Sequence, residues 1–277
     1  SYGVMTHRFN GNGGYIHSVA CESIADSLPI VQHANDPSAI IRVRGKAIYL
    51  YRPDGSLADT LTIMPREGCT FLGWGVNSNA ATVPISTYGD ARVDQAPDVY
   101  ALWNVAVKWD GNGGRWNGAL DEASVKEVMV RGGTGNLFGP SGDPSPIRPG
   151  YVFQGWSTDR QGSGTPEKSV SIEHDPVTFY AQWRAIDYDL GFDTNSEPGD
   201  ADYAGEPKDD QTVNVESGPT VIEDPKRPGY VFQGWTIPNA EGTEAIEQDL
   251  VYQGDDGKWY VDASKLPDYY EQLKNEE

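Results

Sequence analysis

The sequence contains few of the side chains that build reactive centres. Only 2 cysteines and 4 histidines occur among 277 residues. Their spacings match none of the paired patterns that hold zinc, and no local signature indicates a Cys–His nucleophile system. The sequence therefore predicts no catalytic residues, no cofactor and no metal centre built on these side chains.

The two cysteines, Cys21 and Cys69, lie in the first third of the chain. They could form one disulfide or remain two buried thiols, and the sequence does not decide between these states. Export from the cell would permit the disulfide, because oxidising compartments preserve such bonds.

Long apolar runs are also absent. No stretch approaches the roughly 18–20 residues needed to cross a bilayer. The start of the chain, Ser1–Gly3, lacks the basic residues and apolar run of a signal peptide. We therefore expect an internal, extracellular segment without membrane insertion, whose export signal and anchor lie outside it.

Basic residues are scarce, with 21 Lys and Arg against 41 Asp and Glu and a formal net charge of −20. An acidic surface repels phosphate groups, which excludes nucleic acid as a partner and disfavours anionic membranes. The segment 187–210 is rich in carboxylates that could collect calcium, and the candidates are Asp189, Asp193, Asp200 and Asp202. It contains no Asp-x-Asp-x-Asp-Gly loop, so a plainly solvated loop is the competing interpretation.

An internal repeat organises the chain. Arg148–Trp156 and Arg227–Trp235 have the same sequence, Arg-Pro-Gly-Tyr-Val-Phe-Gln-Gly-Trp, and Arg66–Trp74 is a looser copy. We call this the corner motif. An opening motif, an aromatic residue followed by Asn/Asp-Gly-Asn-Gly-Gly, occurs at Phe9–Gly14 and Trp109–Gly114. These two copies precede the corner motifs at Arg66 and Arg148, respectively.

A degraded opening motif, Tyr188–Asp193, precedes the third corner motif. A closing motif ends the first two units at Asp98–Trp103 and Val177–Trp183, whereas Ala263 stands where the third closing tryptophan is expected. The recurring order predicts three repeat domains. Their expected bounds are 1–104 with an insertion, 105–184, and 185–277 as an atypical, acidic, capping repeat.

Within each unit the motifs predict short strands joined by tight turns. The Asn-Gly pair of the opening motif favours a turn with positive φ, and Pro-Gly turns the chain before a strand such as Tyr151–Trp156. Gly155 permits a bulge or a close approach of backbone or an aromatic ring. Between these strands we expect a short helix or hairpin, with helices over 120–130 and from Glu22 to Leu28. Residues 47–51 predict a strand that enters a turn.

The order of these three motifs resembles the Listeria–Bacteroides repeat, also described as the internalin-type B repeat. The resemblance implies small β-grasp-like units in tandem on bacterial surface proteins, and it brings no catalytic residues. The expected fold is therefore α+β but predominantly β, with three tandem small repeat domains in an elongated array. Glu67-Gly68-Cys69 and Ala263 depart from the family pattern.

The aromatic side chains divide into repeated and unrepeated ones. A tryptophan that recurs at the same motif position predicts a core residue, because aromatic rings carry large buried areas. The expected core residues are Trp74, Trp103, Trp156, Trp183 and Trp235. The unrepeated rings of Tyr49, Tyr51 and Trp116 are the candidates for contact with a partner.

Together these features predict a non-catalytic extracellular segment of a bacterial cell-surface protein. It would act as an adhesion or protein-interaction module or as a spacer stalk, with host or bacterial surface proteins, and also glycans, as partners. One alternative is a carbohydrate-binding module that uses the unrepeated aromatics of repeat one. Another alternative is an enzyme domain within the repeat-one insertion. The sequence offers no convergent set of polar residues that would support it.

Overall fold

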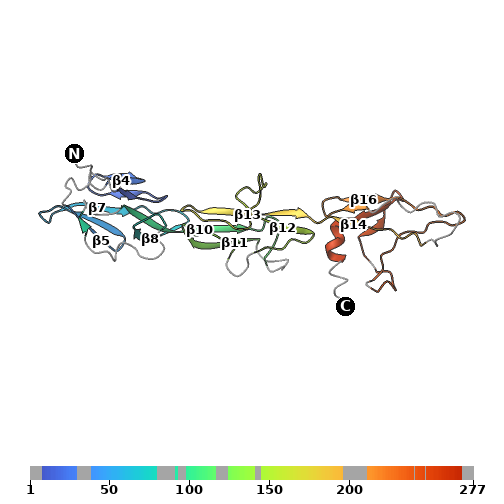
Figure 1. Ribbon diagram of the computed structural model, residues 1–277. Coiled ribbons are helices and arrows are strands. Elements are labelled where there is room, and N and C mark those ends of the chain that lie inside the picture. Colours follow the sequence, from blue (N-terminus) through green and yellow to red (C-terminus); the bar gives the residue numbers. More distant parts are fainter. Residues whose placement is uncertain are drawn as a thin grey trace. The chain divides into compact units, whose positions relative to one another are not determined.

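We describe the fold from a computed structural model of the chain (Figure 1). The structure describes residues 8–29, 39–79, 91–92, 98–116, 124–140, 145–195, 211–239, 241–246 and 248–269. The described chain is predominantly β, as the sequence predicts.

The strands are short apart from one long central strand. In chain order they are β1 (Arg8–Asn10), β2 (Ile16–Ser18), β3 (Ser23–Ala25), β4 (Ser27–Pro29), β5 (Ile40–Arg44), β6 (Ala47–Tyr51), β7 (Leu57–Ile63), β8 (Cys69–Gly75), β9 (Ala91–Arg92), β10 (Val99–Asp110), β11 (Val125–Arg131), β12 (Tyr151–Ser157), β13 (Val177–Ala185), β14 (Tyr188–Leu190), β15 (Gln211–Val213), β16 (Pro219–Ile222), β17 (Val251–Gln253) and β18 (Trp259–Asp262). The 3-10 helix η3 (Ala263–Lys265) follows, and helical residues continue through 266–269. In the part of the chain with described structure, no helix is long and apolar enough to span a bilayer.

The chain divides into two compact units. The first comprises Ser1–Asn112, Ala119–Pro146 and Gly155–Gln182, and the second comprises Gly113–Gly118, Ile147–Gln154 and Trp183–Glu277. Each unit has its own buried residues, and we describe them in turn.

Strand β10 is the centre of the first unit. It pairs in parallel with β1 and β13 and antiparallel with β8 and β11. Its first half carries the closing motif of repeat one and its second half leads into the opening motif of repeat two. One continuous strand therefore belongs to two sequence repeats.

The register of these pairs is the same in repeats one and two. Phe9 of the first opening motif pairs with Val99, and Trp109 of the second pairs with Phe179. Each partner lies the same number of residues before its closing tryptophan, Trp103 or Trp183. The recurring motifs therefore specify the same strand pairing twice.

Repeat one adds a second sheet of six strands, in the order β3-β2-β7-β6-β5-β9. The predicted strand over 47–51 is confirmed as β6, and Gly55 in the following turn has a φ of 88°. The helix expected from Glu22 to Leu28 is wrong, because this stretch forms β3 and β4. Strand β3 pairs with β2 and β4 pairs with β1, so ladder hydrogen bonds replace helical ones.

The helix expected over 120–130 is also wrong for its described part. Residues Val125–Arg131 form strand β11, which pairs along its whole length with β10, from Asp110 to Asn104. Val125, Val128 and Val130 are β-branched, and such side chains favour a pleated strand over a helix. Tertiary pairing with β10 therefore overrides the helix formers between them.

The glycine of each Gly-Trp pair adopts the same unusual conformation. Gly73, Gly155 and Gly234 have φ values of 135°, 128° and 143°, which side chains rarely tolerate. A Cβ on Gly155 would lie 2.7 Å from the backbone oxygen of Glu167. A register shift also occurs where β8 pairs with β10, between Leu102 and Trp103. Both predicted reasons for this glycine, a bulge and a close approach, are therefore found.

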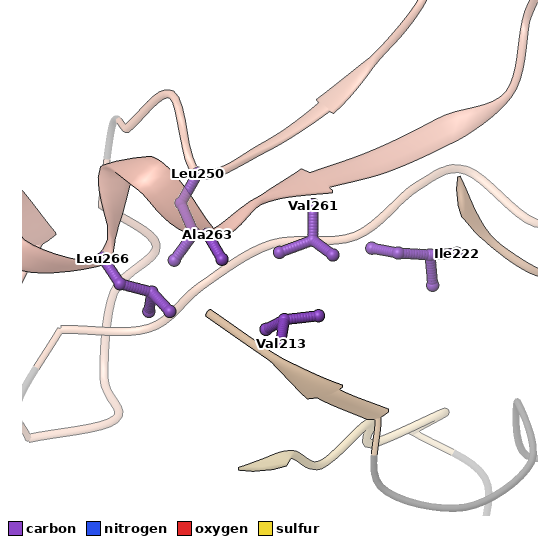
Figure 2. Packing of buried hydrophobic residues seen from close by; sticks show 6 residues of the cluster. All are labelled: Val213, Ile222, Leu250, Val261, Ala263 and Leu266. Carbon is purple, nitrogen blue, oxygen red and sulfur yellow. The ribbon is translucent and has the colours of Figure 1, made fainter. Parts of the chain in front are cut away.

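The second unit has a small apolar core of its own. Figure 2 shows its six buried residues, with Val261 of β18 pointing toward Val213 of β15; the others are Ile222, Leu250, Ala263 and Leu266. Ala263 is fully buried in this cluster. A tryptophan at this position would overfill the core, which accounts for the missing closing tryptophan.

Repeat three does not reproduce the strand pairing of repeat two. Strand β14 pairs with β15, and β18 lies between β16 and β17 in a separate sheet. Residues 230–236, which include the corner motif's expected strand, are assigned to no strand. Tyr151–Trp156, which has the same sequence as Tyr230–Trp235, lies in β12 of repeat two. The strand expected at this place in repeat three is therefore wrong.

Candidate functional site

The predicted partner aromatics lie in different environments. Tyr49 and Tyr51 are half-buried on β6, and the Arg42 guanidinium lies 4.9 Å from the ring centre of Tyr51. Trp116 is 0% exposed, so its ring cannot meet a partner at the surface, and the expectation for Trp116 is corrected. An unrepeated aromatic residue can still be a core residue.

The recurring tryptophans divide into two groups. Trp74, Trp103 and Trp156 are fully buried, and each Nε1 donates a hydrogen bond to a backbone oxygen: to Lys46, to Gly11 and to Phe138, respectively. Trp183 and Trp235 are only partly buried. Trp183 packs edge-on against Phe153 with ring centres 5.7 Å apart.

No disulfide joins Cys21 to Cys69. Cys21 is exposed, so it is not one of two buried thiols, and Cys69 is half-buried in β8. Burial raises the pKa of the Cys69 thiol, and the Arg66 guanidinium only partly opposes this shift. The thiolate of Cys69 is therefore disfavoured at neutral pH, which argues against a nucleophilic role.

The structure describes two of the four calcium candidates. Asp189 accepts a hydrogen bond from Thr212 Oγ1 at 2.7 Å, and Asp193 accepts one from the Asn195 backbone at 2.8 Å. Asp200 and Asp202 lie outside the described residues. In the described ranges, no three side chains of His, Cys, Asp or Glu gather as metal ligands. Calcium binding at 187–210 remains a prediction.

The opening-motif asparagine joins its motif to the closing motif and to the segment that follows the corner motif. In repeat one, Asn12 Nδ2 donates to the backbone oxygens of Ser78 and Ala101, both at 3.0 Å. In repeat two, Asn112 Nδ2 donates to the oxygens of Arg160, at 3.1 Å, and Ala181, at 2.9 Å. The acceptors occupy matching positions, one just after the Gly-Trp pair and one in the closing motif.

This asparagine clamp was not foreseen from the sequence. The Asn-Gly pair predicted a turn, and the turn is confirmed, because Asn112 and Gly113 have φ values of 48° and 94°. The recurrence of Asn rather than Asp at this position was the available signal, since only the amide can donate to two carbonyl groups. Gly191 stands at the matching position of repeat three, which therefore lacks the clamp.

The corner motif of repeat one receives a segment of repeat two. Ala106 donates its backbone N–H to the Gly68 oxygen at 2.7 Å. A Cβ on Gly68 would lie 3.0 Å from Pro176 Cγ. The Arg66 guanidinium donates to the His174 oxygen at 2.6 Å and pairs with the Asp175 carboxylate. We call a corner motif filled when a later segment of the chain bonds to its glycine oxygen and lies against the α-carbon of that glycine.

The corner motif of repeat two is also filled, but the side chains that cover it come from the turn between β15 and β16 and not from the segment before a closing strand. Ile186 donates its backbone N–H to the Gly150 oxygen at 2.9 Å. An added Cβ on Gly150 would overlap Val215 Cγ1. Tyr151 donates a hydrogen bond from its hydroxyl to Glu216 at 3.1 Å. Glycine is thus required at both corners, because the segment that follows lies against its α-carbon.

His174 lies at the filled corner of repeat one, between two asparagines. Its Nδ1 lies 3.3 Å from Asn12 Nδ2, which is a donor, and its Nε2 lies 3.1 Å from Asn79 Oδ1. This arrangement suits a neutral ring that carries its proton on Nε2. Burial lowers the pKa of His174 below its usual value, and the nearby Asp175 and Glu173 carboxylates offset this only in part.

Acidification is expected to weaken the first unit through His174. In the unfolded chain the ring titrates near its usual pKa of about 6.5, and in the folded chain it titrates lower. Below pH of about 6.5 the unfolded chain therefore binds more protons, so stability falls until the pH has passed the folded pKa. Urea midpoints between pH of about 7.5 and 5 test this. His174→Gln should lose less stability over that range, and an equal loss in both proteins would contradict the assignment.

The repeat geometry agrees with a known family. The family model of the Listeria-Bacteroides repeat domain matches residues 106–182 and 188–255, which together exceed half of the chain. The chain belongs to the Listeria–Bacteroides repeat family. The two matches correspond to repeats two and three, and repeat one has the same register through β1 and β10.

Two proteins of Evansella cellulosilytica are similar to the chain. One, with the provisional name Gly-rich membrane protein, is 28% identical over 218 residues, which is 74% of this chain and 22% of the relative. The other, provisionally named a membrane protein, is 26% identical over 192 residues, or 68% of this chain and 26% of the relative. The chain thus spans about a quarter of the length of these relatives.

Proposed function

We propose that the chain is a non-catalytic, extracellular repeat segment of a bacterial cell-surface protein. It would serve as an adhesion or protein-interaction module or as a spacer stalk, built from the tandem domains 1–104, 105–184 and 185–277. The observation that carries the proposal is the matching pair of filled corners at Gly68 and Gly150. A repeat that docks by its motif onto the next one is suited to extend a chain rather than to enclose a substrate.

The relatives support the location. Both have names that describe membrane proteins, and each is several times longer than the matched region. A surface role fits the net charge of −20, because an acidic exterior stays soluble and avoids anionic membranes. β-Grasp-like units and attachment to a cell wall are part of this proposal.

Solution scattering tests the array. A compact domain of 277 residues would have a radius of gyration of about 19 Å, whereas three domains in a row should exceed about 30 Å. Limited proteolysis should then cut between the domains before it cuts within them. A radius near the compact value would contradict the stalk.

Glycan binding by repeat one is a second candidate. A hollow of about 390 Å³ lies in the first unit, and its lining residues are Asn10, Gly13, Gly14, Tyr15, Asp26, Ser27 and Asp175. The Tyr15 ring is 56% exposed beside these polar groups, and an aromatic face with amide and carboxylate groups can orient a sugar. A glycan array with and without calcium tests this role, and hits that Tyr15→Ser does not weaken would place binding elsewhere.

A further inference from the structure

The six-stranded sheet of repeat one covers the core with one of its two faces. Ile41 and Val43 of β5, Ile48 and Leu50 of β6, and Leu61 of β7 are each at most 4% exposed. Successive side chains of a strand point to opposite sides, so the residues that alternate with these point away from the core. We call the side to which they point the outer face, and its residues on these strands include Arg42, Arg44, Tyr49, Tyr51, Leu57 and Thr60.

Aromatic and apolar side chains occupy much of the outer face. The strand register places Tyr49 between Arg42 of β5 and Thr60 of β7. Tyr51, two residues further along β6, lies opposite Leu57, which is 49% exposed. The solvated face of an antiparallel sheet is normally polar. Exposed apolar and aromatic groups gathered on such a face typically mark a contact surface.

The outer face is basic although the chain as a whole is acidic. Asp59 is the one acidic residue in β5, β6 and β7, and it is 3% exposed on the inner side, where it accepts a hydrogen bond from Ser18. Residues 40–63 have a net charge of +2, whereas residues 184–277 contain 23 Asp and Glu against 7 Lys and Arg. At about 0.15 M salt, charges more than about 8 Å away are largely screened. The charge of the outer face itself therefore decides which groups approach it.

The side chains of the outer face define the chemistry of its occupant. Guanidinium groups such as that of Arg42 form paired hydrogen bonds with carboxylates. Tyrosine rings offer a flat apolar surface with a polar hydroxyl at its rim, and the Thr60 hydroxyl can both donate and accept hydrogen bonds. Only alternate residues of these short strands point outward, which is fewer than the roughly 20–30 residues that one side of a stable protein interface supplies. A narrow chain of sugars with carboxylate groups therefore fits this face better than a protein surface.

We propose that the outer face binds a polysaccharide that contains uronic acids. Tyr49 and Tyr51 would stack against the sugar rings, while Arg42 and Arg44 pair with the sugar carboxylates. The Arg42 guanidinium already lies 4.9 Å from the Tyr51 ring centre, and such pre-organisation lowers the entropic cost of binding. The inference rests on the proposed adhesion role and names its partner, and its residues differ from those of the hollow beside Tyr15.

Calorimetric titration of the whole chain with polygalacturonate at about 0.15 M salt tests the proposal. The fully methyl-esterified polymer is the matched probe, because it keeps the sugar chain and removes the charge. We expect a Kd in the micromolar to millimolar range for the acid and at least about tenfold weaker binding of the ester. Tyr51→Thr and Arg44→Gln should each weaken binding of the acid by about fivefold or more. Arg44 is exposed, so its variant should fold normally, and Tyr51→Phe should still bind because the ring remains.

Tyr230→Thr is the matched control in the second unit. Tyr230 is 65% exposed and lies 3.9 Å from the Arg227 guanidinium, so it is a second arginine–tyrosine pair, and its variant should bind polygalacturonate normally. Tyr15→Ser should also bind normally, and an effect of this variant in place of Tyr51→Thr would move the site to the hollow and overturn the proposal. Equal binding of acid and ester, or stronger binding of poly-glutamate, would overturn it as well. An extended chain by scattering that binds no polygalacturonate would retain the stalk and refute the glycan contact.

Discussion

Trp156→Ala is expected to destabilise the first unit by about 3–5 kcal/mol, the usual cost of deleting a buried indole. Trp156 is 1% exposed and packs edge-on against Trp109, with ring centres 4.9 Å apart. Its Nε1 donates to the Phe138 oxygen at 2.9 Å, so the variant also leaves that carbonyl without its donor. Hydrogen exchange of the β12 and β13 amides would measure the loss as a fall in local opening free energy.

Trp235→Ala provides the comparison within an identical stretch of sequence. Trp235 is partly exposed, and its Nε1 has no hydrogen-bond partner in the described structure. It contacts Phe192 and Phe232 through ring edges only. We expect Trp235→Ala to lower the free energy of unfolding by about half as much as Trp156→Ala, because the Trp235 side chain buries less apolar surface. Equal losses would show that the two corner motifs are equally buried in solution.

Asn112→Ala is expected to destabilise repeat two by about 3 kcal/mol. The variant removes two hydrogen bonds, each with a net value of about 1 kcal/mol, and the Ala181 residue that accepts one of them is fully buried. Alanine also pays about 1 kcal/mol for the positive φ that Asn112 adopts. Asn112→Asp should be similarly damaging, because a carboxylate would face two carbonyl oxygens without a proton to donate.

Asn136→Ala separates these contributions. Asn136 has a φ of 56°, close to that of Asn112, but it is exposed and its side chain makes no hydrogen bond within the described residues. Its replacement should cost about 1 kcal/mol, the backbone contribution alone. Urea unfolding of the three variants gives the comparison. If Asn112→Ala were no worse than Asn136→Ala, the clamp would not stabilise the repeat.

The sequence motifs predicted several strands and turns of the fold. Alternating residues around Trp109 and the Asn112-Gly113 pair predicted a strand and a turn with positive φ, and both are present. Local chemistry suffices there, because few residues tolerate such a φ. The helices expected over 22–28 and 120–130 failed, since strand pairing with β1, β2 and β10 decides those segments. The strands that pair with these segments lie outside them, so the residues of the segments alone did not show that they would form strands.

The candidate sites were less predictable. Trp116 is unrepeated yet buried, and the clamp at Asn112 depends on carbonyl groups that lie 48 and 69 residues away in sequence. No sequence motif indicated a role for His174 at the first corner. Its neighbours Asn12 and Asn79 are distant in sequence and lie beside it only in the folded chain. The recurrence of one residue type at the same motif position was a better indicator of a structural role than the secondary-structure propensity of that residue.

The recurring motifs were enough to identify a Listeria–Bacteroides repeat protein, because their turns and glycines require particular backbone angles at set positions. The role of each copy of the corner motif depends on its tertiary contacts. Tyr151–Trp156 and Tyr230–Trp235 have the same sequence, yet the first lies in strand β12 and the second lies in no strand and is more exposed. The difference arises because burial and ladder pairing depend on which segments arrive from elsewhere in the chain.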